Sequence, residues 1–129
     1  MAAADLKKIL LVVPVFHAVY PRPFTRFLEM AVVAGRQLGY VFAIHTPERQ
    51  GLVTAMNTAV AIVLDQAFDA MVIFDDDCLP PPDAIKRLLE RCFEENRPFV
   101  AGAGVMRGYP FTTTVAKLLQ GRLFRRGAR

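Results

Sequence analysis

Residues 70–77 read Ala70-Met71-Val72-Ile73-Phe74-Asp75-Asp76-Asp77, an apolar run that leads directly into three carboxylates. Five consecutive apolar residues are typical of a strand that is buried on both faces of a sheet. The segment that follows, Pro80-Pro81-Pro82-Asp83, suits a first helical turn, because proline lacks the N–H that would be unpaired there. We therefore expect a buried strand, an acidic connection and a helix, in this order.

The same alternation of strand and helix signals extends along the rest of the chain. Strands are expected where apolar runs are continuous, at 9–13, 40–46 and 99–101. Helices are expected where apolar residues recur every three or four positions, at 24–38, 52–67 and after 80–83. Gly39 is placed to end the first helix, and Pro14, which cannot donate to a sheet ladder, is placed to end the first strand.

Strands separated by single helices predict a parallel sheet that is covered on both sides. The expected fold class is therefore α/β, a Rossmann-like three-layer sandwich with a mainly parallel sheet. No internal repeat or interdomain linker divides the chain. The predicted core consists of apolar residues on the expected buried faces, namely Leu10, Val12, Leu28, Val32, Ile44, Val60, Leu64, Val72, Phe74, Leu88 and Val100.

Composition and charge indicate a globular domain that is followed by a basic segment. Apolar residues make up 53% and charged residues 22% of the chain, which is a globular balance. The net charge of +4 is concentrated in residues 117–129, which hold several basic side chains and no acidic one. We expect an α/β domain over 1–116 and a solvated basic tail over 117–129. Because that domain is nearly neutral, nucleic acid is not the expected partner.

The sequence predicts neither a membrane span nor a disulfide framework. Its apolar runs are far shorter than the roughly 20 residues that a membrane-spanning helix needs. The first residues lack the basic and apolar regions of a signal peptide. The two cysteines, Cys78 and Cys92, do not form a CxxC pair. We therefore expect a cytoplasmic protein with two reduced thiols.

The acidic triplet is the candidate ligand site. In a parallel sheet, ligands bind outside the carboxyl ends of the strands, where the three carboxylates are expected. If the strand stays extended, alternation places Asp75 and Asp77 on one side and Asp76 on the other. Carboxylate pairs suit hard cations such as Mg²⁺ or Mn²⁺, which also bridge phosphate oxygens. The alternative is an acidic loop that is solvated and inert.

Four segments, in the same order, resemble GT-A-fold glycosyltransferases of the family-two type. Residues 72–83 resemble the DXD segment of that family. Residues 13–16, which read Val-Pro-Val-Phe, resemble the end of its first strand. Residues 49–57 resemble its R/K-x-G-L…A-R-N segment, and residues 101–110 resemble the segment after its fourth strand. The resemblance implies a GT-A-like fold and a metal-dependent glycosyltransferase of the hexosyltransferase type.

The resemblance also implies a role for individual residues. Asp77 would ligate Mn²⁺ or Mg²⁺, and Asp75 would contact the ribose or join the metal's ligands. The donor would be a nucleoside-diphosphate sugar, and the acceptor is not identified. The implied nucleotide-sugar-binding residues are Pro14, Val15, Phe16, Arg49, Asn57 and Asp75, of which the first three would border the base.

The chain departs from the family pattern at three places. Met56 stands where the family usually has arginine, and His45-Thr46 stands where many members have an acidic pair. The sequence stops near the point where the acceptor-binding half usually begins, so we expect a truncated domain, the N-terminal nucleotide-sugar-binding part. No catalytic base is assigned. A catalytically silent nucleotide-binding or oligomerising domain of the same fold therefore remains an alternative, and a homo-oligomer is a further expectation.

A receiver domain of the response-regulator type is the second alternative. Asp76, Pro80 and Asp83 resemble the residues around a receiver's phosphorylated aspartate. Receivers, however, carry an acidic pair after their first strand, where this chain has residues 13–16 without an acidic side chain. The sequence therefore favours the glycosyltransferase interpretation.

Overall fold

The computed structural model describes residues 6–15, 18–102, 112–119 and 122–127. The chain divides into two compact units, Met1–Leu89 and Glu90–Arg129. The first unit contains a parallel sheet with helices on both faces, and the second contains a pair of antiparallel strands. The described part therefore has the α/β class that the sequence predicts.

The sheet of the first unit has three parallel strands in the order β2-β1-β3. They are β1 (Lys8–Val12), β2 (Val41–His45) and β3 (Ala70–Ile73). In the register, Leu11 pairs with Ile44 on one side and with Val72 on the other. The central position of β1 explains why its apolar run is continuous, since Ile9 to Val12 are all buried.

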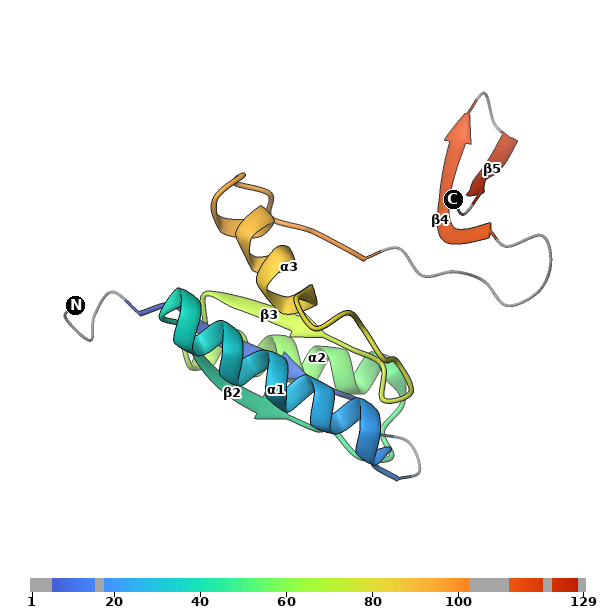
Figure 1. The fold of residues 1–129 in the computed structure, drawn as a ribbon. Coiled ribbons are helices and arrows are strands. Elements are labelled where there is room, and N and C mark those ends of the chain that lie inside the picture. The colour runs from blue at the N-terminus through green and yellow to red at the C-terminus, as the bar shows by residue number, and fades with distance from the viewer. Residues whose placement is uncertain (1–5, 16–17, 103–111, 120–121, 128–129) are drawn as a thin grey trace. The chain divides into compact units, whose positions relative to one another are not determined.

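The two long helices cover opposite faces of this sheet (Figure 1). They are α1 (Pro21–Leu38) and α2 (Leu52–Asp65). The strand order explains the arrangement: the chain leaves β1 toward one edge and then crosses to the other. Two right-handed crossovers in opposite directions therefore place their helices on opposite sides. The result is the predicted three-layer sandwich.

Each helix covers one set of alternating side chains from β1. Leu10 and Val12 form a buried cluster with Ala59 of α2, and Met56 and Val63 pack against it. Alternation along the strand directs Ile9 and Leu11 to the opposite face, which α1 covers. The residues that α1 buries are Phe27, Met30, Ala31 and Ala34.

Part of the predicted core is wrong. Leu10, Val12, Val72 and Phe74 are buried as expected, whereas Leu88 and Val100 are half-buried. Both helices instead present a neighbouring face that carries small residues, Ala31 and Ala34 on α1 and Ala55 and Ala59 on α2. On α1 the same face also buries two large residues, Phe27 and Met30. The predicted core residues that are exposed are Leu28 and Val32 on α1, Val60 and Leu64 on α2, the last of these with 74% of its surface accessible, and Ile44 on the edge strand β2.

The first helix begins earlier than the sequence suggested and ends where it predicted. Pro21 is the first helical residue, because a proline is tolerated in the first turn, where its missing N–H would have no partner. Gly39 ends the helix in a left-handed conformation with φ of 69°. Its N–H donates to the carbonyl of Gly35 over 3.1 Å, which closes the last turn.

The third helix agrees with the sequence prediction, whereas the segment that follows it does not. α3 (Ala84–Phe93) buries Ile85 and Leu89 on its expected face. The expected strand at 99–101 is wrong, because these residues form no strand and Phe99 is 87% exposed. Three apolar residues between Pro98 and Gly102 are too few to establish a ladder, and the proline cannot donate to one.

The second unit contains β4 (Thr112–Leu119) and β5 (Arg122–Gly127), which pair antiparallel. The predicted boundary after residue 116 falls within β4, and the division into a domain and a basic tail remains a prediction. Among the described helices, none combines the length and the apolar character needed to cross a membrane.

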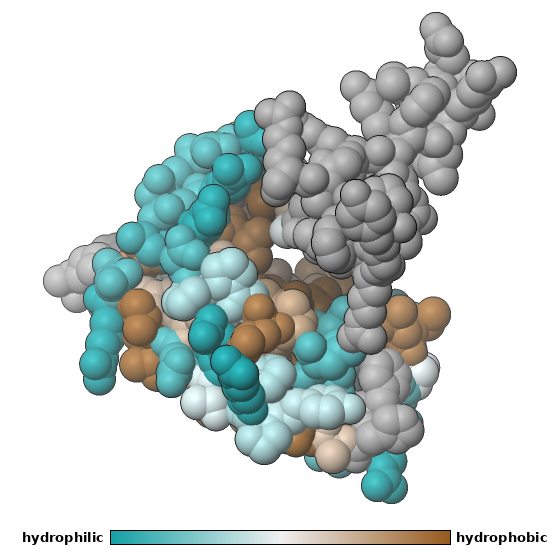
Figure 2. All heavy atoms as spheres, turned by 45° about the vertical axis from the view of Figure 1, so that its right-hand side comes forward, coloured by the Kyte–Doolittle hydropathy of each residue, from teal (hydrophilic) through white to brown (hydrophobic). Residues whose placement is uncertain are grey.

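Exposed apolar residues are distributed over the surface of the described part. In Figure 2 they form separate brown areas among hydrophilic side chains on the face that is shown. Single exposed apolar residues are normal, and a contiguous patch would be needed to indicate an interface. Self-association therefore remains a prediction.

Candidate functional site

The carboxyl ends of the three parallel strands meet at one edge of the sheet. The N–H of Val13 donates to the carbonyl of His45 over 3.0 Å, and the N–H of Phe74 donates to the carbonyl of Val12 over 3.0 Å. The segments that leave β1, β2 and β3 therefore start side by side. In open α/β sheets, ligands bind at this edge, so a ligand-binding site is expected here.

Backbone pairing continues beyond the ends of β1 and β2. Val15 donates to the carbonyl of Pro47 over 2.9 Å and accepts from the N–H of Arg49 over 2.9 Å. Pro14 and Val15 are buried, whereas the side chain of Arg49 is exposed. The backbone of Arg49 is left-handed, with φ of 50°, a strained conformation for a residue with a side chain. The pairing thus fixes Arg49 beside the end of β1.

The three aspartates lie in a turn that directly follows β3. We call residues 75–79 the acidic loop. The N–H of Cys78 donates to the carbonyl of Asp75 over 3.2 Å, so Asp76 and Asp77 occupy the centre of the turn. The expectation of an extended strand with alternating carboxylates is therefore wrong, because the sheet ladder ends before Asp75. Asp75 and Asp77 are exposed and Asp76 is half-buried.

The thiol of Cys78 belongs to the same turn as the carboxylates of Asp75 and Asp77. Partial burial raises the pKa of its thiol, and the negative charges of Asp75 and then Asp77 raise that pKa further. Both carboxylates are therefore close enough to one thiol to act on it. Asp75 is the first residue of this turn and Asp77 the third, so both carboxylates belong to one turn together with Cys78.

Two consecutive residues of α1 contact the two ends of the acidic loop. The ring of Phe27 stacks on that of Phe74, with centroids 5.1 Å apart. The guanidinium of Arg26 donates from Nη1 to the carbonyl of Pro80 over 2.8 Å. The sequence did not reveal these contacts, because they join residues about fifty positions apart and neither Arg26 nor Phe27 belongs to a motif.

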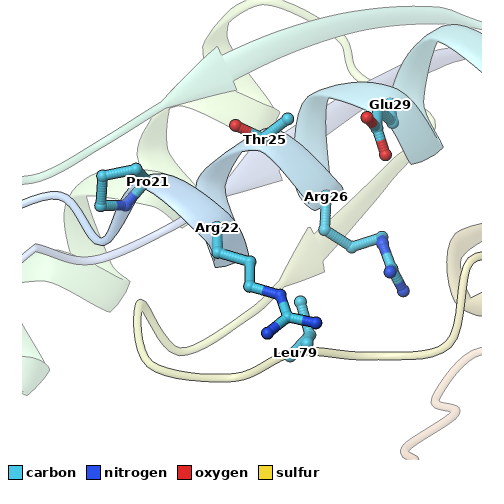
Figure 3. Close-up of a pocket in the computed structure, with 6 residues that line it drawn as sticks. All are labelled: Pro21, Arg22, Thr25, Arg26, Glu29 and Leu79. Atoms are coloured by element: carbon cyan, nitrogen blue, oxygen red, sulfur yellow. The ribbon is translucent and has the colours of Figure 1, made fainter.

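A hollow of about 430 Å³ opens between α1 and the acidic loop. Figure 3 shows the side chains of Arg22 and Arg26 extending from the helix toward the segment that carries Leu79. None of the sequence-predicted site residues lines this hollow. Its lining residues are Pro21, Arg22, Thr25, Arg26, Glu29 and Leu79.

Comparison with known proteins identifies the family. The sequence model of Glycosyl transferase family 2 matches residues 29–127, which include β2, β3 and the acidic loop. The chain belongs to glycosyl transferase family 2. No curated protein and no solved structure matches the chain.

Membership in glycosyl transferase family 2 confirms the resemblance seen in the sequence and supports a glycosyltransferase function. It also decides against the receiver interpretation. The proposed roles of all the individual site residues remain predictions, and Pro14 and Val15 also lie outside the matched range. Phe16, the third residue of that group, lies outside the described residues.

Among the described residues, the carboxylates of Asp75 and Asp77 are the candidate ligands for a cation, and they would fill only part of its coordination shell. Among them, no group of three His, Cys, Asp or Glu side chains is placed to hold a metal ion. Mg²⁺ usually takes one or two carboxylates and completes its shell with water and substrate phosphates. Asp75 and Asp77, both exposed on one turn, fit that pattern in a glycosyl transferase family 2 chain.

Two departures from the family pattern have structural correlates. Met56 packs against the buried cluster of Leu10, Val12 and Ala59, so its position serves the core beneath α2. The Nε2 atom of His45 is buried without a hydrogen-bond partner among the described residues. Asn57, the next residue after Met56, is exposed.

Proposed function

We propose that the chain binds a nucleoside-diphosphate sugar through a divalent cation held by Asp75 and Asp77, and transfers the sugar to an acceptor. The observation that carries this proposal is the placement of both carboxylates around one turn at the carboxyl end of β3. Family membership supports the transferase class, and the carboxyl-end edge is where such a sheet binds ligands.

The electrostatics of the acidic loop favour a cation. Three adjacent carboxylates repel one another, and the structure gives no salt bridge between any of them and a described basic residue. A divalent cation removes this repulsion and offers its remaining coordination positions to phosphate oxygens. The same charges that raise the pKa of Cys78 would therefore supply the attraction for Mn²⁺ or Mg²⁺.

The other residues at the edge would orient the donor. Pro14 and Val15 would provide a buried border for the base, and the backbone of Val15 is fixed by pairing with Pro47 and Arg49. The exposed guanidinium of Arg49 would approach the base or the phosphates. The exposed amide of Asn57 would donate a hydrogen bond to the donor. When bound, the cation would stabilise the charge on the departing nucleoside diphosphate.

Release of nucleoside diphosphate tests this function. The chain is incubated with a panel of nucleoside-diphosphate sugars, with Mn²⁺ or with a chelator. We expect release in Mn²⁺ only, and its loss in Asp77→Ala. The matched control is Asp83→Ala, because Asp83 is an exposed aspartate outside the acidic loop that pairs with Arg87 over 3.9 Å. Release that survives in Asp77→Ala would contradict the assignment.

A catalytically silent nucleotide-binding domain is the second candidate. The observation that favours it is Met56, which occupies the core where the family usually supplies an arginine to the phosphates. Metal-dependent binding of a nucleoside diphosphate without turnover of any sugar donor would select this alternative. Turnover that depends on Asp77 would exclude it.

A further inference from the structure

One turn of α1 contacts the two residues that flank the acidic loop, one before it and one after it. Phe27 stacks on Phe74, the residue before the loop, with ring planes only 10° apart. Arg26 donates to Pro80, the residue after the loop. Since Arg26 and Phe27 are consecutive, one turn of α1 contacts the residues that flank the loop on both sides.

The bond from Arg26 satisfies a carbonyl that the following helix does not use. Pro80 is buried, and a buried carbonyl needs a hydrogen-bond partner. The first turn before α3 is closed by the N–H of Ala84, which donates to Pro81 over 3.1 Å. The half-buried guanidinium of Arg26 supplies the donor to Pro80, and a charged donor makes a stronger bond than a neutral one.

We propose that Arg26 is a positioning residue that holds the acidic loop in the conformation in which Asp75 and Asp77 meet a metal-bound diphosphate. The part that concerns the diphosphate rests on the proposed function. The part that concerns the loop rests on the bond to Pro80 and on the adjoining ring stack.

Arg22 provides a matched comparison on the same helix. It is one turn earlier, lines the same hollow and is exposed (Figure 3). Unlike Arg26, it makes no hydrogen bond to a described residue of the loop or to Pro80. A general effect of positive charge in the hollow should be shared by both arginines, whereas an effect on loop geometry should be specific to Arg26.

Amide hydrogen exchange on the full chain tests the hold on the loop without any ligand. In Arg26→Met we expect the amides of residues 75–79 to exchange about tenfold faster, because a charge-assisted bond at the end of the loop is lost. Exchange over β1, residues 8–12, should stay as in the wild type. Arg26→Lys keeps a charged donor and should restore most of the protection, and Arg22→Met should match the wild type.

Three exchange results would overturn the proposal: unchanged exchange at 75–79 in Arg26→Met, an equal increase in Arg22→Met, or an equal increase over β1. The last would make Arg26 a residue of general stability. If Arg26→Met does not fold, the experiment uses Arg26→Gln instead. This variant keeps a shorter polar side chain that can donate a hydrogen bond. The same three results would overturn the proposal.

Calorimetry with Mn²⁺ and nucleoside diphosphate tests the consequence for binding. We expect affinity to fall about tenfold in Arg26→Met and to be unchanged in Arg22→Met. Equal affinity in Arg26→Met and the wild type would overturn the positioning role. Absence of binding in the wild type would instead remove the proposed function, and with it the ligand-related part of the proposal. The exchange data would still decide whether Arg26 holds the loop.

Discussion

The ring of Phe27 on α1 lies against the ring of Phe74 at the end of β3, with centroids 5.1 Å apart and planes nearly parallel. Phe27 is 1% exposed and Phe74 is 9% exposed, so the stack belongs to the core. Phe74 is also the residue that precedes Asp75. The stack therefore joins the packing of the first helix to the start of the acidic loop.

Removal of one ring from this stack should destabilise the fold. We expect Phe27→Ala to lower the free energy of unfolding by about 3–5 kcal/mol, because it leaves a cavity and exposes Phe74. Urea denaturation followed by circular dichroism measures the change. Val33→Ala on the same helix, 47% exposed in the native chain, should change stability by less than about 0.5 kcal/mol. Equal midpoints for the two variants would argue against the packing described here.

The thiol of Cys78 should respond to the charge of Asp75. Burial, Asp75 and Asp77 raise its pKa, which reduces the thiolate fraction at a given pH. In a Cys92→Ser background, Asp75→Asn removes one negative charge and should lower this pKa. Alkylation by iodoacetamide at pH 8 should then be faster, and the midpoint of the rate against pH should move to lower pH. An unchanged profile would mean that the carboxylate is not near the thiol, and Asp83→Asn serves as the control.

Gly39 should tolerate a side chain poorly. Its φ of 69° lies in the left-handed region, which costs an alanine about 1–2 kcal/mol. Gly39→Ala should therefore lower the urea midpoint. Gly102→Ala should not, because a Cβ there meets no atom within 4 Å. A stable Gly39→Ala would indicate that the helix ends in a different conformation.

A strand that is buried on both faces is predictable, because such burial leaves a continuous apolar run. This holds for β1, and the central position of that strand explains the run. The buried faces of the helices were not predictable in the same way. On α1, Phe27 and Met30 are buried while Leu28 and Val32 are exposed, so apolar residues surround the helix and periodicity cannot select one face. The buried face of α1 combines large and small residues, Phe27 and Met30 with Ala31 and Ala34.

The candidate site was predictable in its position and only partly in its geometry. The run from Val72 into Asp75 located the carboxylates at the carboxyl edge. Their turn was not predictable from alternation, since the ladder ends one residue before Asp75. The contact from Arg26 to Pro80 depends on how α1 packs in three dimensions, and a single sequence carries no local signal for it.

Calorimetry with a panel of nucleoside diphosphates, with and without Mn²⁺, tests the central claim most directly. The account predicts that the wild type binds one or more of them in Mn²⁺ only. Asp75→Asn and Asp77→Asn should each weaken binding at least about tenfold, while Asp83→Asn should bind as the wild type does. Binding that is independent of Mn²⁺ and of both carboxylates, or no binding to any nucleoside diphosphate, would contradict the assignment of the acidic loop.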